Sequence, residues 1–312
     1  MTPTQLRTYS TVVREGSVRQ AAATLGVTEA AVSYNVGALR KEFDDRLFYR
    51  SEKGLVFTPG GLRLAQRSFE LLGLQAQTRR EVIEAGQGHR SLRIAATSLF
   101  AEYAAPGLID FLSTAAGDLQ VELVVHPLER FAELLSTHAV DVAIGPKSAS
   151  TLSASIRETP FLRYELIAAT TLDLADAKLE KQTWLLGPSA VEPAGVSQFI
   201  LERVGVPETN QRIYPSHAAA LEEVREGAGI ALVPSFAVER GLASEALVRV
   251  DDARCRAPGC WTAFTPEADR TSPAAADLMR LIETPRAIRA MLEGSGTTVG
   301  HFRPSVHITL WS

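Results

Sequence analysis

Residues 17–43, SVRQAAATLGVTEAAVSYNVGALRKEF, contain two helix start signals separated by a glycine. Ser17 and Gln20 form a capping-box pattern, and the helix that follows ends at Gly26. Thr28 then caps a second helix. Apolar residues recur along this helix at spacings of four, three and four: Val32, Val36, Leu39 and Phe43. Two helices joined by so short a turn match a helix-turn-helix, although an αα-hairpin that merely packs against a core has the same local pattern.

The flanking residues favour the DNA-binding interpretation. Thr2, Pro3 and Gln5 predict a capped helix before the pair. After the pair, residues 46–57 have the pattern of two short strands around a polar turn, as in a wing that reaches DNA phosphates. We therefore predict a winged helix-turn-helix over residues 1–58.

This N-terminal segment closely resembles the LysR-type transcriptional regulators. The matching positions are Leu6, Gly16, Ser17, Ala21, Ala22, Leu25, Val27, Thr28, Ala31, Val32, Ser33, Val36, Leu39, Leu47, Phe48, Arg50, Thr58, Pro59, Gly60 and Gly61. The resemblance extends more weakly to about residue 292. It implies a regulator that binds double-stranded promoter DNA, senses a small-molecule effector, forms a homodimer or homotetramer, and has RNA polymerase as a further candidate partner.

Carried over by position, the resemblance assigns DNA contacts to the motif's second helix and to the wing. The residues are Thr28, Glu29, Ala30, Ser33 and Tyr34, with Arg50 and Lys53 on the wing. Glu29 and Ala30 stand where the family commonly has Gln and Pro, and Tyr34 stands where Arg is common. A carboxylate accepts from a cytosine amino group but cannot make the contacts of Gln, so we expect an altered operator preference. The pair Phe43-Asp44, in place of Leu-Gly, predicts a different helix cap.

A long helix is predicted after the wing. Thr58 and Pro59 form a start signal, and the helix runs over residues 59–85 within a linker of residues 59–90. Its apolar residues alternate by three and four in the manner of a coiled-coil seam: Leu62, Ala65, Phe69, Leu72, Ala76 and Ile83. The resemblance implies that this helix pairs two chains; a helix that packs on its own domain is the alternative.

Residues 91–292 alternate short apolar runs with helical segments, which predicts an α/β sheet covered on both faces. The predicted strands are residues 92–97, 121–125, 140–145, 166–170 and 230–233, and the predicted helices are residues 106–115, 129–138, 195–204 and 217–226. The resemblance implies a periplasmic-binding-protein-like effector domain with two subdomains, residues 91–161 plus 266–292 and residues 162–265. Residues 293–312 form a tail without a motif.

Polar residues at strand ends and helix starts are the candidates for the effector site, because ligands of such sheets bind there. They are Thr97, Ser98, His126, Ser216 and His217. For each of them, helix capping or an exposed surface position is the alternative role. Arg130, Lys147 and Arg163 would favour a carboxylate effector.

Charge and composition are consistent with this division. The net charge is -4, but residues 1–90 carry 13 basic against 9 acidic side chains, and the remainder is acidic. Two isolated cysteines, Cys255 and Cys260, complete no zinc pattern, so we expect no metal and no cofactor. The sequence shows no secretion signal and no long apolar run, which predicts a cytoplasmic protein without a membrane segment.

Three other classes of protein compete with a regulator. An α/β enzyme is disfavoured because the chain has no nucleophile elbow, no phosphate-binding glycine loop and no His-Glu-x-x-His pattern. A periplasmic solute-binding protein would leave the basic helical N-terminus unexplained. A small-molecule-binding protein without specific DNA binding remains the alternative, and a mobility-shift experiment distinguishes it.

Overall fold

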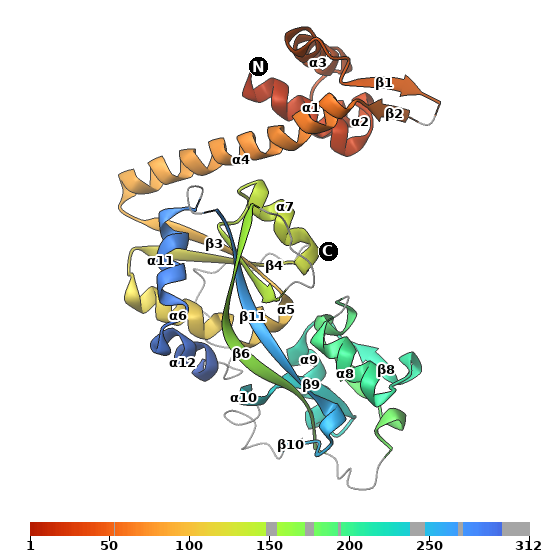
Figure 1. The fold of residues 1–312 in the computed structure, drawn as a ribbon, viewed down its shortest axis with the longest axis vertical. Coiled ribbons are helices and arrows are strands. Elements are labelled where there is room, and N and C mark those ends of the chain that lie inside the picture. Colours follow the sequence, from red (N-terminus) through yellow and green to blue (C-terminus); the bar gives the residue numbers. More distant parts are fainter. Residues whose placement is uncertain are drawn as a thin grey trace. The chain divides into compact units, whose positions relative to one another are not determined.

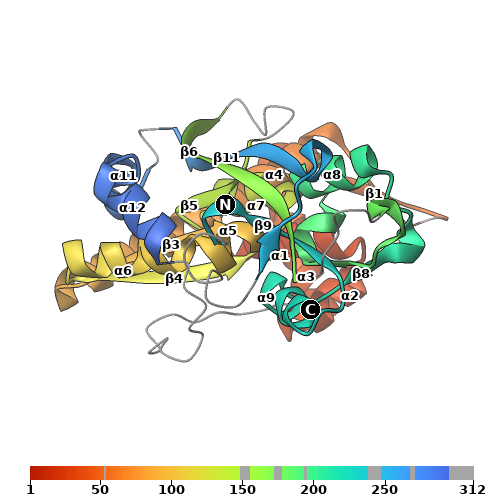
Figure 2. The same cartoon turned by 90° about the horizontal axis from the view of Figure 1, so that it is seen from below.

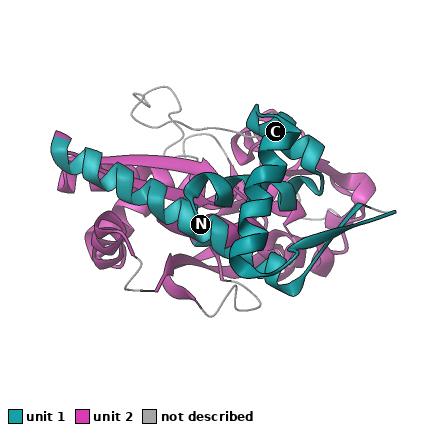
Figure 3. Ribbon diagram, turned by 90° about the horizontal axis from the view of Figure 1, so that it is seen from above, with its two compact units in different colours: residues 1–86, 136–139 teal, residues 87–135, 140–312 magenta. Residues whose placement is uncertain are grey.

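The chain divides into two compact units in the computed structural model, and each unit has its own hydrophobic core residues (Figure 3). Unit 1 comprises residues 1–86 and 136–139, and unit 2 comprises residues 87–135 and 140–312. The residues that the structure describes are 1–52, 54–147, 155–171, 178–192, 195–237, 247–267 and 271–294. Within them, no helix is both long enough and apolar enough to cross a membrane.

The helices of unit 1 begin at the predicted caps. Its elements are α1 (Pro3–Glu15), α2 (Val18–Leu25), α3 (Glu29–Phe43), β1 (Phe48–Ser51), β2 (Gly54–Phe57) and α4 (Pro59–Gln87). Thr2 and Gln5 close a full capping box, and the hydroxyls of Ser17 and Thr28 accept the N–H of the third residue of α2 and α3. Gly26 ends α2 in the left-handed conformation. The winged helix-turn-helix arrangement, with β1 antiparallel to β2, is thereby confirmed.

The predicted apolar stripe of α3 is correct at three of its four positions. Val32, Val36 and Leu39 are buried in the core of unit 1, whereas Phe43 is 45% exposed. Phe43 is the last residue of α3, and the chain leaves the helix at Asp44, which has φ 49°. Asp44 therefore adopts the left-handed cap conformation that glycine usually supplies.

The start of α4 is fastened to the winged fold by a small polar junction. The Thr58 hydroxyl donates to Asp45 at 2.9 Å and accepts the Gly61 N–H at 2.8 Å. The Asp45 carboxylate also accepts the N–H of Leu47. A Cβ at Gly61 would lie 2.1 Å from the Leu47 carbonyl oxygen, so glycine is required for this close approach.

Beyond its first turns, α4 exposes many apolar side chains. Of the predicted seam, Ala65 is buried in the core of unit 1, whereas Leu62 and Ile83 are exposed. Packing against its own domain thus accounts for the start of α4. The exposed large apolar residues of this helix are Leu62, Leu71, Leu74, Val82 and Ile83.

Unit 2 contains one mixed sheet in the order β4-β3-β5-β11-β6-β9-β7-β8, with β10 paired to β6 (Figure 1). The strands are β3 (Arg90–Ala96), β4 (Leu119–Val125), β5 (Val142–Pro146), β6 (Ile156–Thr170), β7 (Trp184–Leu186), β8 (Gln211–Ile213), β9 (Ile230–Pro234), β10 (Val248–Arg249) and β11 (Arg256–Pro266). The helices are α5 (Ser98–Tyr103), α6 (Ala105–Ala115), α7 (Phe131–Ser136), α8 (Val196–Val204), α9 (His217–Arg225), α10 (Ser235–Ala237), α11 (Pro273–Leu281) and α12 (Pro285–Glu293).

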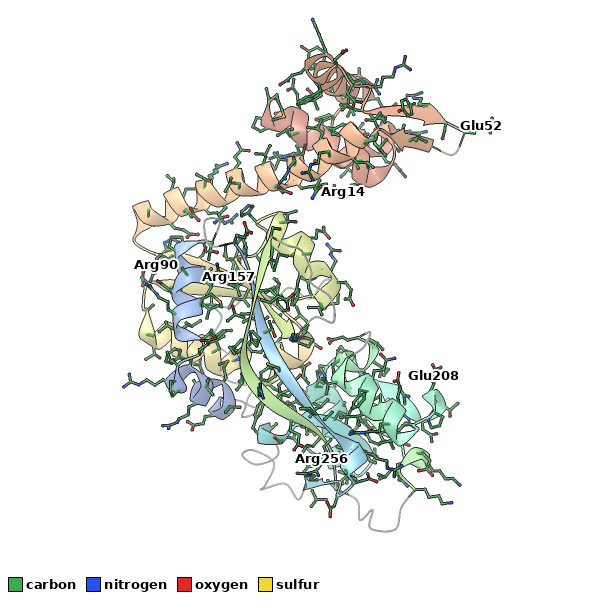
Figure 4. The ribbon with its side chains drawn as sticks, in the orientation of Figure 1. Arg14, Glu52, Arg90, Arg157, Glu208 and Arg256 are labelled. Carbon is green, nitrogen blue, oxygen red and sulfur yellow. The ribbon has the colours of Figure 1, made fainter. Side chains whose placement is uncertain are left out.

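The predicted α/β sheet covered on both faces is confirmed. Alternate residues of β3 point to opposite faces, as strand geometry requires. Ile94 and Ala96 join the large core, and Ala95 joins a second core with Phe131 of α7 and Phe264 of β11. At the start of β3, the side chain of Arg90 (labelled in Figure 4) pairs with Asp118 at 2.7 Å and with Asp277 of α11 at 2.6 Å.

Several elements of unit 2 were not predicted from the sequence. They are β7, β8, β10, β11, residues 156–165 of β6, α5, α10, α11 and α12. Pro258 and Gly259 in β11 and Pro160 in β6 are residues that normally mark the end of a strand, which explains why these two long strands escaped detection.

β6 and β11 form a long antiparallel pair that runs through unit 2 (Figure 2). The register shifts between Trp261 and Thr262, where the extra residue on β6 is Phe161. The pair continues through both of the predicted subdomain crossings, near residues 161 and 265, and these boundaries remain predictions. Most of the predicted tail, residues 295–312, lies outside the described residues.

Candidate functional site

The DNA-contact residues predicted on α3 lie at its exposed start. Glu29, Ala30, Ser33 and Tyr34 are all exposed, and Tyr34 is 77% exposed although it is a large aromatic residue. Thr28 is also exposed, and its hydroxyl caps α3. The opposite face is fixed by the buried valines and by Asn35, whose amide donates to Thr8 of α1 at 3.1 Å. This face of α3 can therefore enter a DNA groove without rearrangement of the core.

An arginine-rich groove lies between α3 and the wing. It has a volume of about 420 Å³ and is lined by Val18, Ser33, Val36, Arg40, Arg46, Phe48, Tyr49 and Arg50. The Arg40 guanidinium lies 4.4 Å from the Phe48 ring centroid and donates to the Phe48 carbonyl at 3.0 Å, so it is held in place. A groove with three guanidinium groups beside a recognition helix is suited to a phosphate.

Arg40 and Arg46 were not among the predicted DNA-contact residues. Arg46 precedes β1 and Arg50 lies within it, four residues further along, and this spacing is a sequence signal that could have indicated Arg46. Lys53, predicted on the wing, lies outside the described residues. Its neighbour Glu52 lies at the end of the wing (Figure 4).

The structure separates the roles of the predicted effector residues. The hydroxyls of Thr97 and Ser98, at the start of α5, are buried and have no hydrogen-bond partner among the described residues, so Thr97 makes no side-chain cap. Ser216, in contrast, caps α9 by accepting the Ala219 N–H at 3.0 Å. The alternative role of helix cap is therefore confirmed for Ser216. His126 follows β4, where burial and the neighbouring Arg130 lower its pKa.

His217 is buried and lies in a chain of hydrogen bonds. Its Nδ1 lies 3.0 Å from Glu102 Oε1, its Nε2 lies 2.8 Å from Ser189 Oγ, and Ser189 in turn lies 2.9 Å from Ser197 Oγ. The Glu102 carboxylate also accepts the backbone N–H groups of His217 and Ala218 at the start of α9. Burial raises the pKa of Glu102, but these bonds and the charge of His217 outweigh burial and leave the pKa below its ordinary value.

Glu102, Ser189 and Ser197 were missed from the sequence because they are far apart along the chain. Glu102 and His217 are separated by 115 residues, and no local spacing relates them. Under the predicted subdomain boundaries, Glu102 belongs to one subdomain and the other three residues belong to the second. The chain of hydrogen bonds thus joins the two predicted subdomains.

Unit 2 also contains a cavity of about 480 Å³ with charged walls. It is lined by Leu128, Glu129, Pro146, Lys147, Pro160, Arg163, Glu192, Gly195, Val196, Pro258, Gly259 and Cys260. Lys147 and Arg163, predicted to favour a carboxylate, are among these residues. Arg130 is not, and it pairs with Glu133 at 3.0 Å instead. None of the five predicted effector residues lines this cavity.

Glu192 has the most perturbed carboxyl group of the cavity. Burial raises its pKa to about 7, and the charge of Glu129 adds to this effect. Since the folded pKa lies above the unfolded value, folding favours the protonated form. The stability of unit 2 should therefore fall as the pH rises from about 4.5 through about 7.

Glu192→Gln is expected to remove this dependence. The variant should be about 2 kcal/mol more stable than the wild type at pH 8 and nearly unchanged at about pH 4, below the unfolded pKa, after allowance for the partial exposure of the side chain. Urea unfolding of the full chain, followed by tryptophan fluorescence at both pH values, measures the difference. Equal stabilities at pH 8 would show that the Glu192 carboxyl is not penalised by burial.

Among the described residues, no cluster of three or more His, Cys, Asp and Glu side chains could hold a metal ion. Cys255 is buried, and burial raises its pKa to about 11, whereas Cys260 is partly exposed at the cavity wall. A buried thiol of raised pKa is a poor nucleophile.

Two family models match this chain. Residues 3–62 match the bacterial regulatory helix-turn-helix protein, lysR family, and residues 85–285 match the LysR substrate binding domain. An uncharacterized HTH-type transcriptional regulator of Mycobacterium tuberculosis is 52% identical, with 100% of both chains covered. The structure of ArgP from Mycobacterium tuberculosis has a TM-score of 0.58 at 18% identity, covering 94% of this chain and 97% of that one. CbnR, a LysR family transcriptional regulator, has a TM-score of 0.59 at 16% identity, covering 93% and 99%.

Proposed function

Because this chain belongs to the LysR family of DNA-binding transcriptional regulators, we propose that α3 and the arginine groove contact promoter DNA and that the cavity of unit 2 binds the effector. The exposed face of α3 beside Arg40, Arg46 and Arg50 is the observation that carries the first half. Base contacts would come from Glu29, Ala30, Ser33 and Tyr34, and phosphate contacts from the arginines. Thr28 and Lys53 are further proposed DNA-contact residues.

Loss of a base contact and loss of a phosphate contact should change DNA affinity differently. Tyr34→Ala should cost about 1–3 kcal/mol on the specific operator and little on scrambled DNA, because base contacts carry sequence preference. Arg50→Ala should weaken binding to both DNAs and reduce the dependence of affinity on salt by about one phosphate contact. Fluorescence anisotropy against the chain's own upstream DNA and a scrambled duplex, at several salt concentrations, separates the two cases.

Arg14→Ala is the matched control, since Arg14 is an exposed arginine of α1 that does not line the groove. It should leave both affinities near the wild-type values. Equal losses for Tyr34→Ala on specific and scrambled DNA would contradict base reading by Tyr34.

The proposed effector is a small molecule that carries a carboxylate. Lys147 and Arg163 line the cavity, and neither forms an ion pair with a described residue. The cavity has the size that small ligands require. Thr97 and Ser98, whose buried hydroxyls have no hydrogen-bond partner among the described residues, remain proposed contacts of a ligand-bound form, as does His126. Ser216 and His217 would support the site indirectly, Ser216 as the cap of α9 and His217 through its hydrogen bonds.

The proposed assembly is a homodimer paired through α4, with a homotetramer built from two such dimers as the larger form and RNA polymerase as a further partner. The exposed apolar residues of α4 support pairing. Effector binding would shift the population between two closures of unit 2 and thereby change how two winged domains are spaced on DNA. Scattering profiles with and without a confirmed ligand test this mechanism, and identical profiles and footprints would exclude it.

A further inference from the structure

The charged residues of the cavity come in two pairs of opposite sign. Lys147 follows β5 and Arg163 lies in β6, two strands that both pair with β11, which lies between them. Glu129 lies in the 3-10 turn η1 (Leu128–Arg130), and Glu192 follows the 3-10 turn η3 (Pro188–Val191). A ligand whose only charged group is a carboxylate would use only the two cations, Lys147 and Arg163.

The two cations are not neutralised by the protein's described residues. Arg163 stands opposite Cys260 in the β6–β11 ladder, which is an uncharged partner. Lys147 forms no ion pair with a described residue. Both side chains line the cavity and are exposed to it, so they can bind an anionic group of a ligand.

The cations of the cavity do not offset the cost of ionising Glu192. Burial and the charge of Glu129 both disfavour ionised Glu192, and no described cation offsets them. A carboxyl group in this position is stabilised as a carboxylate when a positive charge arrives beside it. The missing charge can be supplied by a ligand.

The remaining walls leave room for a compact, partly apolar body. Gly195, Val196, Pro258 and Gly259 are small or rigid. A Cβ at Gly259 would lie 2.3 Å from the Tyr164 ring, so glycine here lets Tyr164 lie against Trp261 with ring centroids 4.4 Å apart. The volume of about 480 Å³ is within the range of small-molecule sites.

We propose that the effector is a zwitterion of the amino-acid class, whose carboxylate binds Lys147 and Arg163 and whose ammonium group binds Glu192 and Glu129. This inference rests on the proposed role of the cavity as the effector site. A dicarboxylate would bring a negative charge to Glu192 and increase the repulsion there. A simple amine would leave both cations without an anion.

Matched ligands test each charge separately. Isothermal titration calorimetry of the full-length protein would use the free L-amino acids, the N-acetyl derivative of each one that binds, and the corresponding decarboxylated amine. At least one free amino acid should bind, and removal of either charge should weaken it about tenfold or more. Binding should also shift a DNA-affinity curve measured in parallel.

Variants assign the two subsites. Glu192→Gln should weaken binding of the free amino acid about tenfold and leave the affinity for the N-acetyl derivative unchanged. Lys147→Gln should weaken binding of both ligands. Glu208→Gln, an exposed carboxylate outside the cavity, is the matched control and should change neither. Thermal unfolding of each variant verifies that it is folded.

The outcomes separate this inference from the proposed function. If an N-acetyl derivative or another carboxylate binds as tightly as the free amino acid and loses affinity in Lys147→Gln, the cavity is an effector site but the ammonium subsite is wrong. If no free amino acid binds at millimolar concentrations while specific DNA binding is intact, the zwitterion is excluded and the DNA-binding half of the proposed function stands. If binding occurs but is unaffected by either variant, the cavity itself is excluded.

Discussion

Replacing Glu102 with alanine is expected to destabilise unit 2 by about 3 kcal/mol. The carboxylate accepts three N–H groups: the backbone of His217 at 3.0 Å, the backbone of Ala218 at 2.9 Å and Nδ1 of His217 at 3.0 Å. The first two belong to the start of α9, where no carbonyl within the helix can replace them. Truncation leaves buried donors unsatisfied, and this costs more than the net value of the bonds.

Urea unfolding of the full chain measures this loss, with Glu133→Ala on the exposed side of α7 as a control of the same residue type. The loss of stability in Glu102→Gln should lie between the losses in Glu102→Ala and Glu133→Ala, because the amide oxygen of glutamine still accepts hydrogen bonds but carries no negative charge. Since the folded pKa of Glu102 is lowered, its stabilisation is present above the unfolded pKa and is lost as the pH falls through the folded one. Wild type and Glu102→Ala should therefore converge in strongly acidic buffer, and equal midpoints at pH 7 would contradict the role of Glu102.

Introducing charges on α4 is expected to separate the proposed dimer. Leu72→Glu with Ile83→Glu places carboxylates at two apolar positions of the predicted seam, the half-buried Leu72 and the exposed Ile83, which lie on one face of the helix. Burial of these carboxylates against a partner chain would require their desolvation. The double variant should sediment as a monomer. Its affinity for the specific operator should fall about 10²-fold or more, because one chain cannot occupy two half-sites together.

Gln75→Glu adds a carboxylate at an exposed polar position between the two and is the matched control. It should keep the assembly and the affinity of the wild type. A double variant that remains dimeric would show that the chains associate through another surface, and unchanged operator affinity in a monomer would contradict binding to paired half-sites.

Local signals predicted the winged fold well. Thr2, Ser17 and Thr28 each accept the N–H that the capping rules assign to them, and Gly26 has the left-handed φ that ends α2. These interactions involve residues within four positions of one another, so local sequence patterns predict them. The error at Phe43 arises because periodicity does not indicate where the covering core ends.

Unit 2 was predictable where strands are uniformly apolar and less so where cavity-lining residues interrupt them. β9 and the last five residues of β6 were recognised as apolar runs, whereas β11 contains Pro258 and Gly259. These two residues line the cavity and shape it, at the expense of the strand pattern. Glu192 and Glu102 gain their roles from partners remote in sequence, which spacing cannot reveal.

The β6–β11 pair determines how unit 2 can bend and twist along these two strands. Its ladder of hydrogen bonds resists bending within the sheet, and the register shift beside Phe161 is an irregularity of the kind that increases the local twist. Strands have an intrinsic right-handed twist, so winding and unwinding are unequal in energy. Three residues belong both to the β6–β11 pair and to the cavity wall: Arg163, Gly259 and Cys260. If the effector binds this cavity as proposed, it would contact these residues, and we expect binding to change the twist of the β6–β11 pair more readily in one direction than in the other.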